Sequence, residues 1–369
     1  MHNITVKQTD DFKTRKRFEL KMQNEEGEIL TSAVCGIFTI SFGAGFIDAL
    51  SFSAVETPMQ HRRKGYVREL FDFALNFGIE QGCVISILHP FSFSYYEKFG
   101  YGKVADHKIL RMPIRLLDTV PRGCELEKWQ ETPEQFEDLY ALHNEFCKNR
   151  QLMMLYSDPK YLKGREIWIY RENGKATGYI SISSSKRLEI NHYEDGLLNV
   201  HSLVYTTPAA LKGLLGFIRM FEGELDDVEF ANLSTCPEVE TYLRHDTHTK
   251  VRLLPDLMAR ALDTEKLLRS FKYPESEGKF TIRIEDKLPT VGGVFSVEYG
   301  NGTAKVNRLE SSAETDVTVN ASTFSRLVFG YDKLTAEQAA FCDGISVSGN
   351  AEDFFRAFSC RISGMFEHF

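Results

Sequence analysis

The sequence lacks the features that mark disulfide-rich, metal-binding or membrane proteins. Its seven cysteines are scattered and no Cys-x-x-Cys pair occurs, so neither a zinc knuckle nor a redox pair is indicated. No apolar run reaches the roughly 18 residues that a membrane-spanning helix needs, and the first residues form no apolar signal core. We therefore expect a cytoplasmic protein with no metal site and no membrane partner.

The chain also has no excess of basic residues. The chain has 44 Lys and Arg against 52 Asp and Glu, which gives a net charge of -8 at pH 7. Nucleic acids are bound by basic surfaces, so we expect no nucleic acid partner. A negative balance is compatible with a cationic amine as substrate, although charge balance by itself indicates only solubility.

Two common phosphate-binding loops are absent as well. There is no Gly-x-x-x-x-Gly-Lys-Ser/Thr, and no Gly-x-Gly-x-x-Gly with an acidic residue about twenty residues further on. A different basic turn is present. Residues 46–55 predict a strand, and apolar residues at three- and four-residue steps over 67–77 predict a helix.

Residues 60–65, Gln-His-Arg-Arg-Lys-Gly, join this strand to this helix. A glycine at the start of a helix allows a ligand to approach the backbone closely. The free N–H groups of the first helical turn then suit a phosphate. The alternative is that residues 62–64 are only a solvated start of the helix.

Three ordered stretches resemble one acetyltransferase family. The turn reads Arg62-x-x-Gly65-x-Val67, which resembles the Gln/Arg-x-x-Gly-x-Gly/Ala pyrophosphate loop of the GNAT (GCN5-related) N-acetyltransferases, with Val67 at the small position. Residues 88–101, LHPFSFSYYEKFGY, resemble the segment that flanks the thioester in these enzymes. The three stretches are VETPMQHRRKGY, which contains the turn, LHPFSFSYYEKFGY, and the later PDLMARALDTEKLL. In this order they resemble the Eis-type (enhanced intracellular survival) branch, and the resemblance covers most of the chain.

This resemblance implies an α/β (α+β) fold with tandem GNAT-like domains followed by a sterol-carrier-protein-like α/β domain. The 369 residues suit two or three domains. We place a catalytic, acetyl-CoA-binding GNAT domain at residues 1–118, a degenerate GNAT-like domain at 119–262, and the sterol-carrier-protein-like domain at 263–369. The last is expected to be a scaffold, with lipid carriage as the alternative.

Two departures from the GNAT plan stand out. The family usually has one strand and two helices before the antiparallel strands that lead to the pyrophosphate loop. Residues 5–16 have no apolar periodicity that could form both helices, so we expect a shortened N-terminus. In the second domain, residues 206–210, Thr-Thr-Pro-Ala-Ala, stand where the basic residues and glycine would be, so we expect no active site there. We assign residues 104–114 as the last strand of the first domain and 257–262 as a strand before the third.

The resemblance also implies where acetyl-CoA lies. Backbone groups on the strand would bind the pantetheine amides, and the turn would surround the diphosphate. The cofactor-binding residues expected in these two roles are Val55, Thr57, Arg62, Arg63, Gly65 and Tyr66.

Acetyl transfer to an amine needs an acid and a base. An alkylamine has a pKa of about 10, so it must lose a proton before it attacks. By resemblance Tyr96 is the acid that protonates the leaving thiolate, and the terminal carboxylate of Phe369 is the base. A terminal carboxylate with a pKa of about 3.5 is weak and would act through water. The alternatives are that Tyr96 is an aromatic core residue and that the apolar tail only packs on the third domain.

Rival bases and functions stay open. Glu56 is a rival base, and His61 and His89 are weaker ones. The acceptor can be an aminoglycoside-like molecule, a polyamine, a peptide amine or a lysine side chain. A non-catalytic protein that binds CoA or lipid is the alternative function. The resemblance implies a homo-hexamer.

Overall fold

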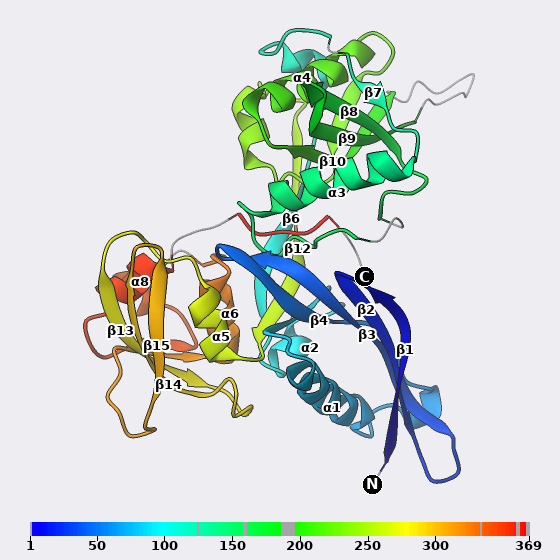
Figure 1. Ribbon diagram of the computed structural model, residues 1–369. Helices are drawn as coiled ribbons and strands as arrows, with labels where there is room; N and C mark the ends of the chain where they lie inside the picture. Colours follow the sequence, from blue (N-terminus) through cyan, green and yellow to red (C-terminus); the bar gives the residue numbers. More distant parts are fainter. Residues whose placement is uncertain are drawn as a thin grey trace. The chain divides into compact units, whose positions relative to one another are not determined.

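The computed structural model describes residues 2–123, 125–157, 161–185, 196–332, 334–358 and 362–366 (Figure 1). The described residues fall into two compact units. The first takes in Met1–Ala105 and Asp256–Ser363, and the second takes in Asp106–Pro255 and Gly364–Glu367. Over this part of the chain, no helix has the length and apolar character needed to cross a bilayer.

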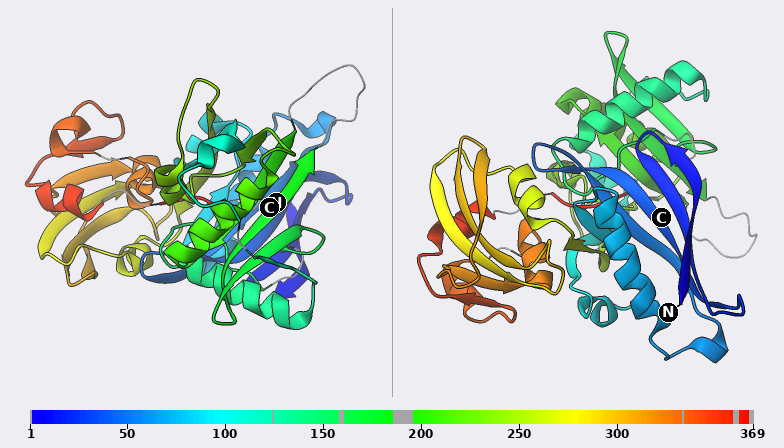
Figure 2. Two further views of the ribbon diagram at one scale, coloured as in Figure 1. Left: turned by 90° about the horizontal axis from the view of Figure 1, so that it is seen from above. Right: turned by 60° about the horizontal axis from the view of Figure 1, so that its bottom comes forward.

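The first unit begins with an antiparallel meander and a helix. The predicted strand at residues 46–55 and the predicted helix at 67–77 are confirmed. Residues 3–12, where we expected a shortened N-terminus, form a largely exposed strand paired with the next one. The long helix packs on one face of the meander (Figure 2). The elements are β1 (Asn3–Phe12), β2 (Arg15–Gln23), β3 (Ile29–Phe42), β4 (Gly45–Glu56), η1 (Met59–His61), α1 (Tyr66–Glu80), β5 (Ile85–Leu88) and α2 (Phe93–Glu97).

The apolar face of α1 joins the helix to the sheet. Leu70, Phe71, Ala74 and Leu75 are buried, which is the three- and four-residue spacing seen in the sequence. The ring of Phe71 stacks on Phe52 of β4 with centroids 4.3 Å apart. Full burial of a side chain of this kind contributes about 1.5–3 kcal/mol. This packing fixes the turn between β4 and α1.

One strand has a partner that differs from the expected one. We expected residues 104–114 to be the last strand of the first domain. They form β6 (Gly102–Pro113), but from Asp106 onward the strand belongs to the second unit, where it pairs antiparallel with β11 (Asp227–Phe230). Apolar periodicity predicts that a strand exists, whereas its partner depends on tertiary contacts.

The place beside β5 is taken by a strand from much later in the chain. β12 (Lys250–Ala261) is longer than expected, and its last residues pair antiparallel with β5, from Met258 opposite Leu88 to Ala261 opposite Ile85. The end of β12, just before the sterol-carrier-protein-like domain expected at residues 263–369, therefore completes the sheet of the first unit. This strand brings Asp256 and Arg260 into the first unit.

The second unit repeats the order of the first. A helix, a hairpin, a strand and a second helix follow one another, and β10 pairs parallel with β11. Thr132 caps α3, and a proline opens the helix, as the sequence indicates. The elements are η2 (Ile114–Leu117), β7 (Glu127–Lys128), α3 (Pro133–Cys147), β8 (Glu166–Glu172), β9 (Lys175–Ser185), β10 (Leu197–Tyr205), α4 (Pro208–Ile218), η4 (Arg219–Phe221), β11 and η5 (Pro237–Tyr242).

The last region of the first unit is a five-stranded sheet with helices. Its strand order is β15-β14-β13-β16-β17. Asp263 caps the opening helix, since Lys266 N donates to Asp263 Oδ1 at 3.0 Å. The elements are α5 (Thr264–Ser270), β13 (Gly278–Glu285), β14 (Gly293–Gly300), β15 (Thr303–Leu309), β16 (Val317–Asn320), α6 (Ala321–Val328), α7 (Ala336–Ala339), β17 (Ile345–Val347) and α8 (Glu352–Ala357).

Phenylalanine rings fill the space between this sheet and α8. Phe354 lies 5.3 Å from Phe280 and 4.9 Å from Phe358, measured between ring centroids, and all three rings are buried. These rings pack α8 against the sheet.

Candidate active site

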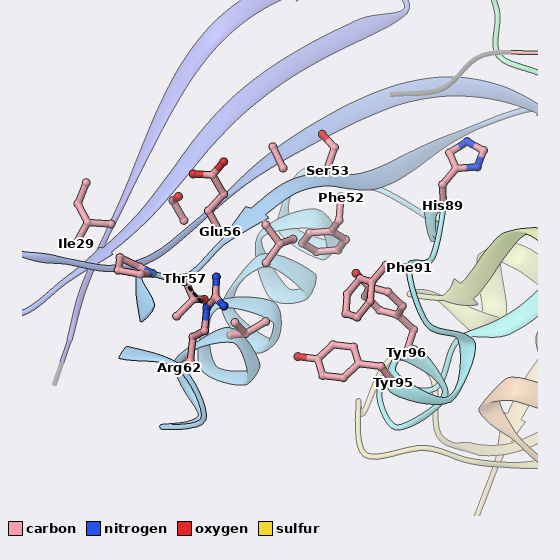
Figure 3. Close-up of a pocket in the computed structure, with 15 residues that line it drawn as sticks. Ile29, Phe52, Ser53, Glu56, Thr57, Arg62, His89, Phe91, Tyr95 and Tyr96 are labelled. Atoms are coloured by element: carbon pink, nitrogen blue, oxygen red, sulfur yellow. Dashed lines mark hydrogen bonds between the residues drawn. The ribbon is translucent and has the colours of Figure 1, made fainter. Parts of the chain in front are cut away.

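A pocket of about 1130 Å³ opens in the first unit (Figure 3). Its walls come from β4 and the turn after it, from the start of β3, and from the segment that follows β5. The residues that line it are Ile29, Ser32, Phe52, Ser53, Ala54, Val55, Glu56, Thr57, Pro58, Arg62, Val67, His89, Phe91, Tyr95 and Tyr96.

The pocket exists because β4 and β5 separate. Their parallel pairing runs only from Ala49 opposite Ile85 to Ser51 opposite Ile87. Beyond this point β4 carries a bulge, because three residues on β4 span two on β3, and Ala54 takes a left-handed φ of 48°. A bulge bends a strand and increases its twist. The end of β4 therefore leaves β5, and the space between them is the pocket.

The bulge leaves Val55 outside the β3 to β4 pairing. Val55 also lines the pocket, at the position where the sequence analysis expects backbone contacts to an extended ligand. Thr57 already has two partners within the protein. Its Oγ1 lies 2.9 Å from Thr31 Oγ1, and its carbonyl accepts a hydrogen bond from Arg62 Nε at 3.1 Å (Figure 3). Both Thr57 and Arg62 line the pocket.

The turn before α1 has the features of an anion site. Gly65 has a φ of 89° and Arg63 a φ of 63°, and no side chain caps the helix. Within the described chain, the N–H groups of residues 64–67 donate no hydrogen bond. Four free donors at the positive end of a 15-residue helix fit a diphosphate. A Cβ on Gly65 would meet open space, so glycine is needed there for its φ.

Three of the predicted residues lie in the turn rather than on the pocket wall. Arg63 and Gly65 are exposed. Tyr66 packs its ring edge-on against His2, with centroids 5.0 Å apart. His61 is buried, and its Nε2 lies 2.8 Å from Glu28 Oε1, a contact that lowers the pKa of Glu28. His61 is therefore a residue that ties the turn to the β2 to β3 loop, and not a base at the pocket.

Tyr96 is a buried phenol at the inner end of the pocket. It is 5 % exposed and lies in an aromatic cluster, where its ring meets Phe91 edge-on at 5.4 Å. Burial, with a smaller contribution from Tyr95, raises the pKa of Tyr96 to about 12. The group is protonated at neutral pH and can donate a proton.

Two of the candidate bases lie on the pocket wall. Glu56 is exposed at the end of β4. His89 follows β5, and its Nδ1 lies 3.0 Å from Asp256 Oδ1, so a carboxylate orients the ring. Asp256 is a residue that the sequence analysis missed, because it lies 167 positions from His89. Phe369 lies outside the described residues.

The second unit does not repeat the anion site. The hydroxyl of Thr207 accepts from Ala210 N at 3.0 Å and donates to Glu172 Oε2 at 2.6 Å. Pro208 stands at the first helical position and has no N–H to offer. A carboxylate and a capped helix start oppose phosphate binding, so residues 206–210 hold no diphosphate. Across the described ranges, no cluster of three or more His, Cys, Asp or Glu could hold a metal ion.

Comparison with known proteins agrees with this geometry. Residues 7–104 match the family model of an acetyltransferase (GNAT) domain, and residues 264–363 match that of a sterol carrier protein domain. Comparison with curated proteins gives no match.

Solved structures share the fold over nearly the whole chain. A GCN5-related N-acetyltransferase from Anabaena variabilis has a TM-score of 0.80 at 16% identity, with 95% of this chain and 89% of that chain covered. Eis1 from Mycobacterium abscessus has a TM-score of 0.78 at 16% identity, with 95% and 91% covered. A GCN5-related N-acetyltransferase from Kribbella flavida has a TM-score of 0.74 at 17% identity, with 95% and 88% covered. The chain is therefore an acyltransferase with a GNAT acetyltransferase domain and a sterol carrier protein domain, and it has the fold of the Eis-type proteins.

Proposed function

We propose that the protein is an acetyl-CoA-dependent N-acetyltransferase. Its acceptor is a primary amine on a cationic small molecule, such as an aminoglycoside or a polyamine, or on a lysine side chain. One observation carries this proposal. A buried, protonated phenol and an arginine of the anion-binding turn, Tyr96 and Arg62, line the same pocket between β4 and β5.

The chain offers a group for each part of acetyl-CoA. The free N–H groups of residues 64–67, with Arg62 and Arg63, would hold the diphosphate. The backbones of Val55 and Thr57, which both line the pocket, would meet the pantetheine amides. When bound there, acetyl-CoA supplies the acetyl group as a thioester. This direction places the sulfur at the aromatic end of the pocket, near Tyr96.

Tyr96 is the proposed acid. The amine nitrogen forms a bond to the acetyl carbon, the bond from that carbon to sulfur breaks, and Tyr96 donates its phenolic proton to the sulfur. The proton that leaves the amine goes to a base. The terminal carboxylate of Phe369 is our first candidate, and Glu56 and His89 on the pocket wall are the others.

The assembly follows from resemblance alone. We propose the hexamer of the Eis-type family, and the domain limits at residues 118 and 262 stay predictions. Light scattering of the purified protein measures the assembly directly. A mass of one chain, 42.2 kDa, would contradict it.

Thiol release from acetyl-CoA tests the activity. The wild-type protein is mixed with acetyl-CoA and, in separate reactions, with spermidine, an aminoglycoside and a lysine-containing peptide, and free CoA is measured with a thiol reagent. We expect amine-dependent release with at least one acceptor. Acetyl-CoA binding without release across the panel would favour the non-catalytic CoA-binding alternative.

A further inference from the structure

The candidate acid lies on a very short helix. α2 has five residues, Phe93–Glu97, and among the described residues no side chain caps its start. A helix of this length is not stable by itself, so its position depends on what holds its ends. Tyr96 O accepts hydrogen bonds from Phe99 N at 2.9 Å and from Tyr101 N at 3.3 Å. The turn of residues 99–101 that follows α2 therefore decides where the phenol of Tyr96 lies.

Both ends of this turn are held by neighbouring strands. Tyr101 OH lies 2.6 Å from Ser86 Oγ of β5, and both side chains are buried. At the other end of the turn, Arg260 of β12 donates a hydrogen bond from Nη1 to Phe99 O. Arg260 stands opposite Ser86 in the pairing of β12 with β5. The turn after α2 is thus tied to two adjacent strands of the sheet.

Arg260 is held in turn by the region that matches the sterol carrier protein model, residues 264–363. Its Nη2 donates to Asp286 Oδ2 at 2.8 Å, and the two side chains are 5% and 6% exposed. Asp286 lies in the loop between β13 and β14, and Leu288 of the same loop packs against the buried core around α1. A buried guanidinium without a counter-ion is costly, so Arg260 keeps its place only while this loop is docked.

The same region also lies directly against the turn after α2. Gly100 has a φ of 80°, and a Cβ there would lie 3.1 Å from Asp286 Oδ2 and 3.2 Å from Ala321 Cβ of α6. Buried rings join the two regions as well, since Phe42 of β3 lies 5.4 Å from Phe329 between ring centroids. The sterol-carrier-protein-like region is therefore packed on the segment that carries the candidate acid.

We propose that Arg260 and Asp286 are positioning residues for acetyl transfer. Through them the sterol-carrier-protein-like region holds the turn after α2, and with it the phenol of Tyr96, at the thioester. Of the described residues that line the pocket, neither Arg260 nor Asp286 is one, so the pair acts through the carbonyl of Phe99 and not on the substrate. This gives the region a part in the reaction that requires no lipid. The inference rests on the proposed function, because its kinetic part needs an active enzyme.

A charge-neutral replacement of the pair is the sharpest variant for the test. Removal of one partner would leave a buried charge and could unfold the protein, whereas replacement of both partners is often tolerated. We choose Arg260→Met together with Asp286→Asn. The oxygen of asparagine can still accept from Leu288 N, which lies 2.7 Å from Asp286 Oδ1. Methionine has no donor for Phe99 O, so the hydrogen bond that holds the turn is lost.

The matched control lies within the sterol-carrier-protein-like region. Arg269 Nη2 lies 2.6 Å from Glu265 Oε1 and donates to Val306 O at 3.0 Å, so this arginine also joins a carboxylate to a backbone carbonyl. All three residues belong to the region itself. Arg269→Met together with Glu265→Gln therefore removes the same chemistry from the region without removing the hydrogen bond to Phe99 O.

Kinetics in two backgrounds separate positioning from general damage. In the otherwise wild-type protein, we expect the Arg260 and Asp286 double variant to lower turnover by about 10- to 100-fold, with acetyl-CoA affinity unchanged, because a small displacement of a catalytic group is costly. In Tyr96→Phe, the same two substitutions should lower the residual turnover by less than about twofold, because the phenol that they misplace is already absent. A general structural defect would lower turnover by the same factor in both backgrounds. The control variant should match the wild-type protein.

Hydrogen exchange of the full-length proteins gives a measurement that needs no activity. Gly100 N donates to Glu97 O at 2.9 Å and Tyr101 N donates to Tyr96 O, so both N–H groups are protected while the turn is held. We expect faster exchange over residues 99–101 in the Arg260 and Asp286 double variant than in the wild-type protein or the control variant.

Each outcome bears on a different claim. Wild-type turnover in the Arg260 and Asp286 double variant, or an equal loss of turnover in the Tyr96→Phe background, would overturn the positioning role. Unchanged exchange over residues 99–101 would show that the pair does not hold the turn. Failure of the wild-type protein to release CoA with any amine would overturn the proposed function instead, while faster exchange in the double variant would still support the hold on the turn.

Discussion

His89 Nδ1 lies 3.0 Å from Asp256 Oδ1, although the two residues are 167 positions apart in the sequence. This contact orients the imidazole of His89 on the wall of the pocket that Tyr96 also lines. A carboxylate that accepts from Nδ1–H selects the tautomer whose Nε2 accepts protons. His89 is therefore an oriented candidate, beside Glu56 on the same wall, for the group that takes the amine proton. Its importance relative to Phe369 and Glu56 can be measured.

Asp256→Ala tests this pair. We expect turnover to fall by roughly 10-fold or more, because the imidazole loses its orienting partner, while acetyl-CoA affinity stays the same. The matched control is Asp246→Ala, which removes the carboxylate from an exposed pair in the second unit, where His248 Nδ1 lies 3.4 Å from Asp246 Oδ2. Equal turnover in the two variants would exclude His89 from the proton path.

Tyr96→Phe removes the proposed acid. Loss of a positioned general acid lowers turnover by about 10²- to 10⁴-fold, and the ring that remains should keep acetyl-CoA affinity within about twofold. Tyr95→Phe is the control, because Tyr95 lines the same pocket with its ring centroid 5.2 Å from that of Tyr96. Since the pKa of Tyr96 is raised to about 12, wild-type turnover should show no loss from this group below about pH 11. Comparable turnover in both phenylalanine variants would assign Tyr96 to packing alone.

Gly65→Asp together with Arg62→Ala should abolish acetyl-CoA binding, as measured by titration calorimetry. The carboxylate would stand among the free N–H groups of α1 and repel the diphosphate, and the strained φ would shift the turn. Gly82→Asp is the control for strain, because Gly82 has a similar φ of 86° and open space around it at the other end of the helix. If the folded double variant bound acetyl-CoA as tightly as the wild-type protein, the turn before α1 would not be the diphosphate site. Wild-type protein should bind one acetyl-CoA per chain, because residues 206–210 lack the basic residues and the glycine of the turn before α1.

Breaking the buried pair of Arg260 and Asp286 should destabilise the first unit. Arg260 NH2 lies 2.8 Å from Asp286 Oδ2, and both side chains are about 5% exposed, with Arg260 also donating to Phe99 O. Removal of one partner leaves a buried charge, so Asp286→Ala should lower the free energy of unfolding by about 3–5 kcal/mol. Glu145→Ala, which breaks an exposed pair with Lys148, should change it by less than about 1 kcal/mol. Urea unfolding measures both, and similar losses would contradict the account.

His143 should make the second unit sensitive to acid. Its ring is fully buried against Tyr156, and burial lowers the pKa of His143 to about 4. The unfolded chain therefore binds a proton between pH 6.5 and 4 that the folded chain excludes, and stability is lost as pH falls through this range. The loss is roughly 3 kcal/mol at about 1.4 kcal/mol per pKa unit. In His143→Gln the unfolding free energy should fall less between pH 7 and 4, and an equal slope would contradict the assignment.

Local features of the fold could be predicted from the sequence. The strand, basic turn and helix around Gly65 are close in sequence, and their periodicities and the glycine predict each element without knowledge of its partners. The Thr132 and Asp263 helix caps follow for the same reason. Residues 206–210 likewise indicate the missing anion site, because capping and proline chemistry are local.

Features that depend on pairing could not be predicted. Ala54 has no preference for a left-handed φ, and its bulge arises from the register between β3 and β4. The exchange of strands that places β12 beside β5, the approach of Asp256 to His89, and the hydrogen bond from Asn232 to Met365 each join residues far apart in the chain. No local pattern reports such contacts, which form only when each unit folds.

The central claim is that Tyr96 and the Gly65 turn serve one acetyl-transfer pocket. The most direct measurement is amine-dependent release of CoA from acetyl-CoA by wild-type protein, Tyr96→Phe and the Gly65 variant, with acetyl-CoA affinity measured for each. The account predicts release by the wild-type protein, binding without release by Tyr96→Phe, and neither by the Gly65 variant. Release by Tyr96→Phe at the wild-type rate, or tight acetyl-CoA binding by the Gly65 variant, would contradict it.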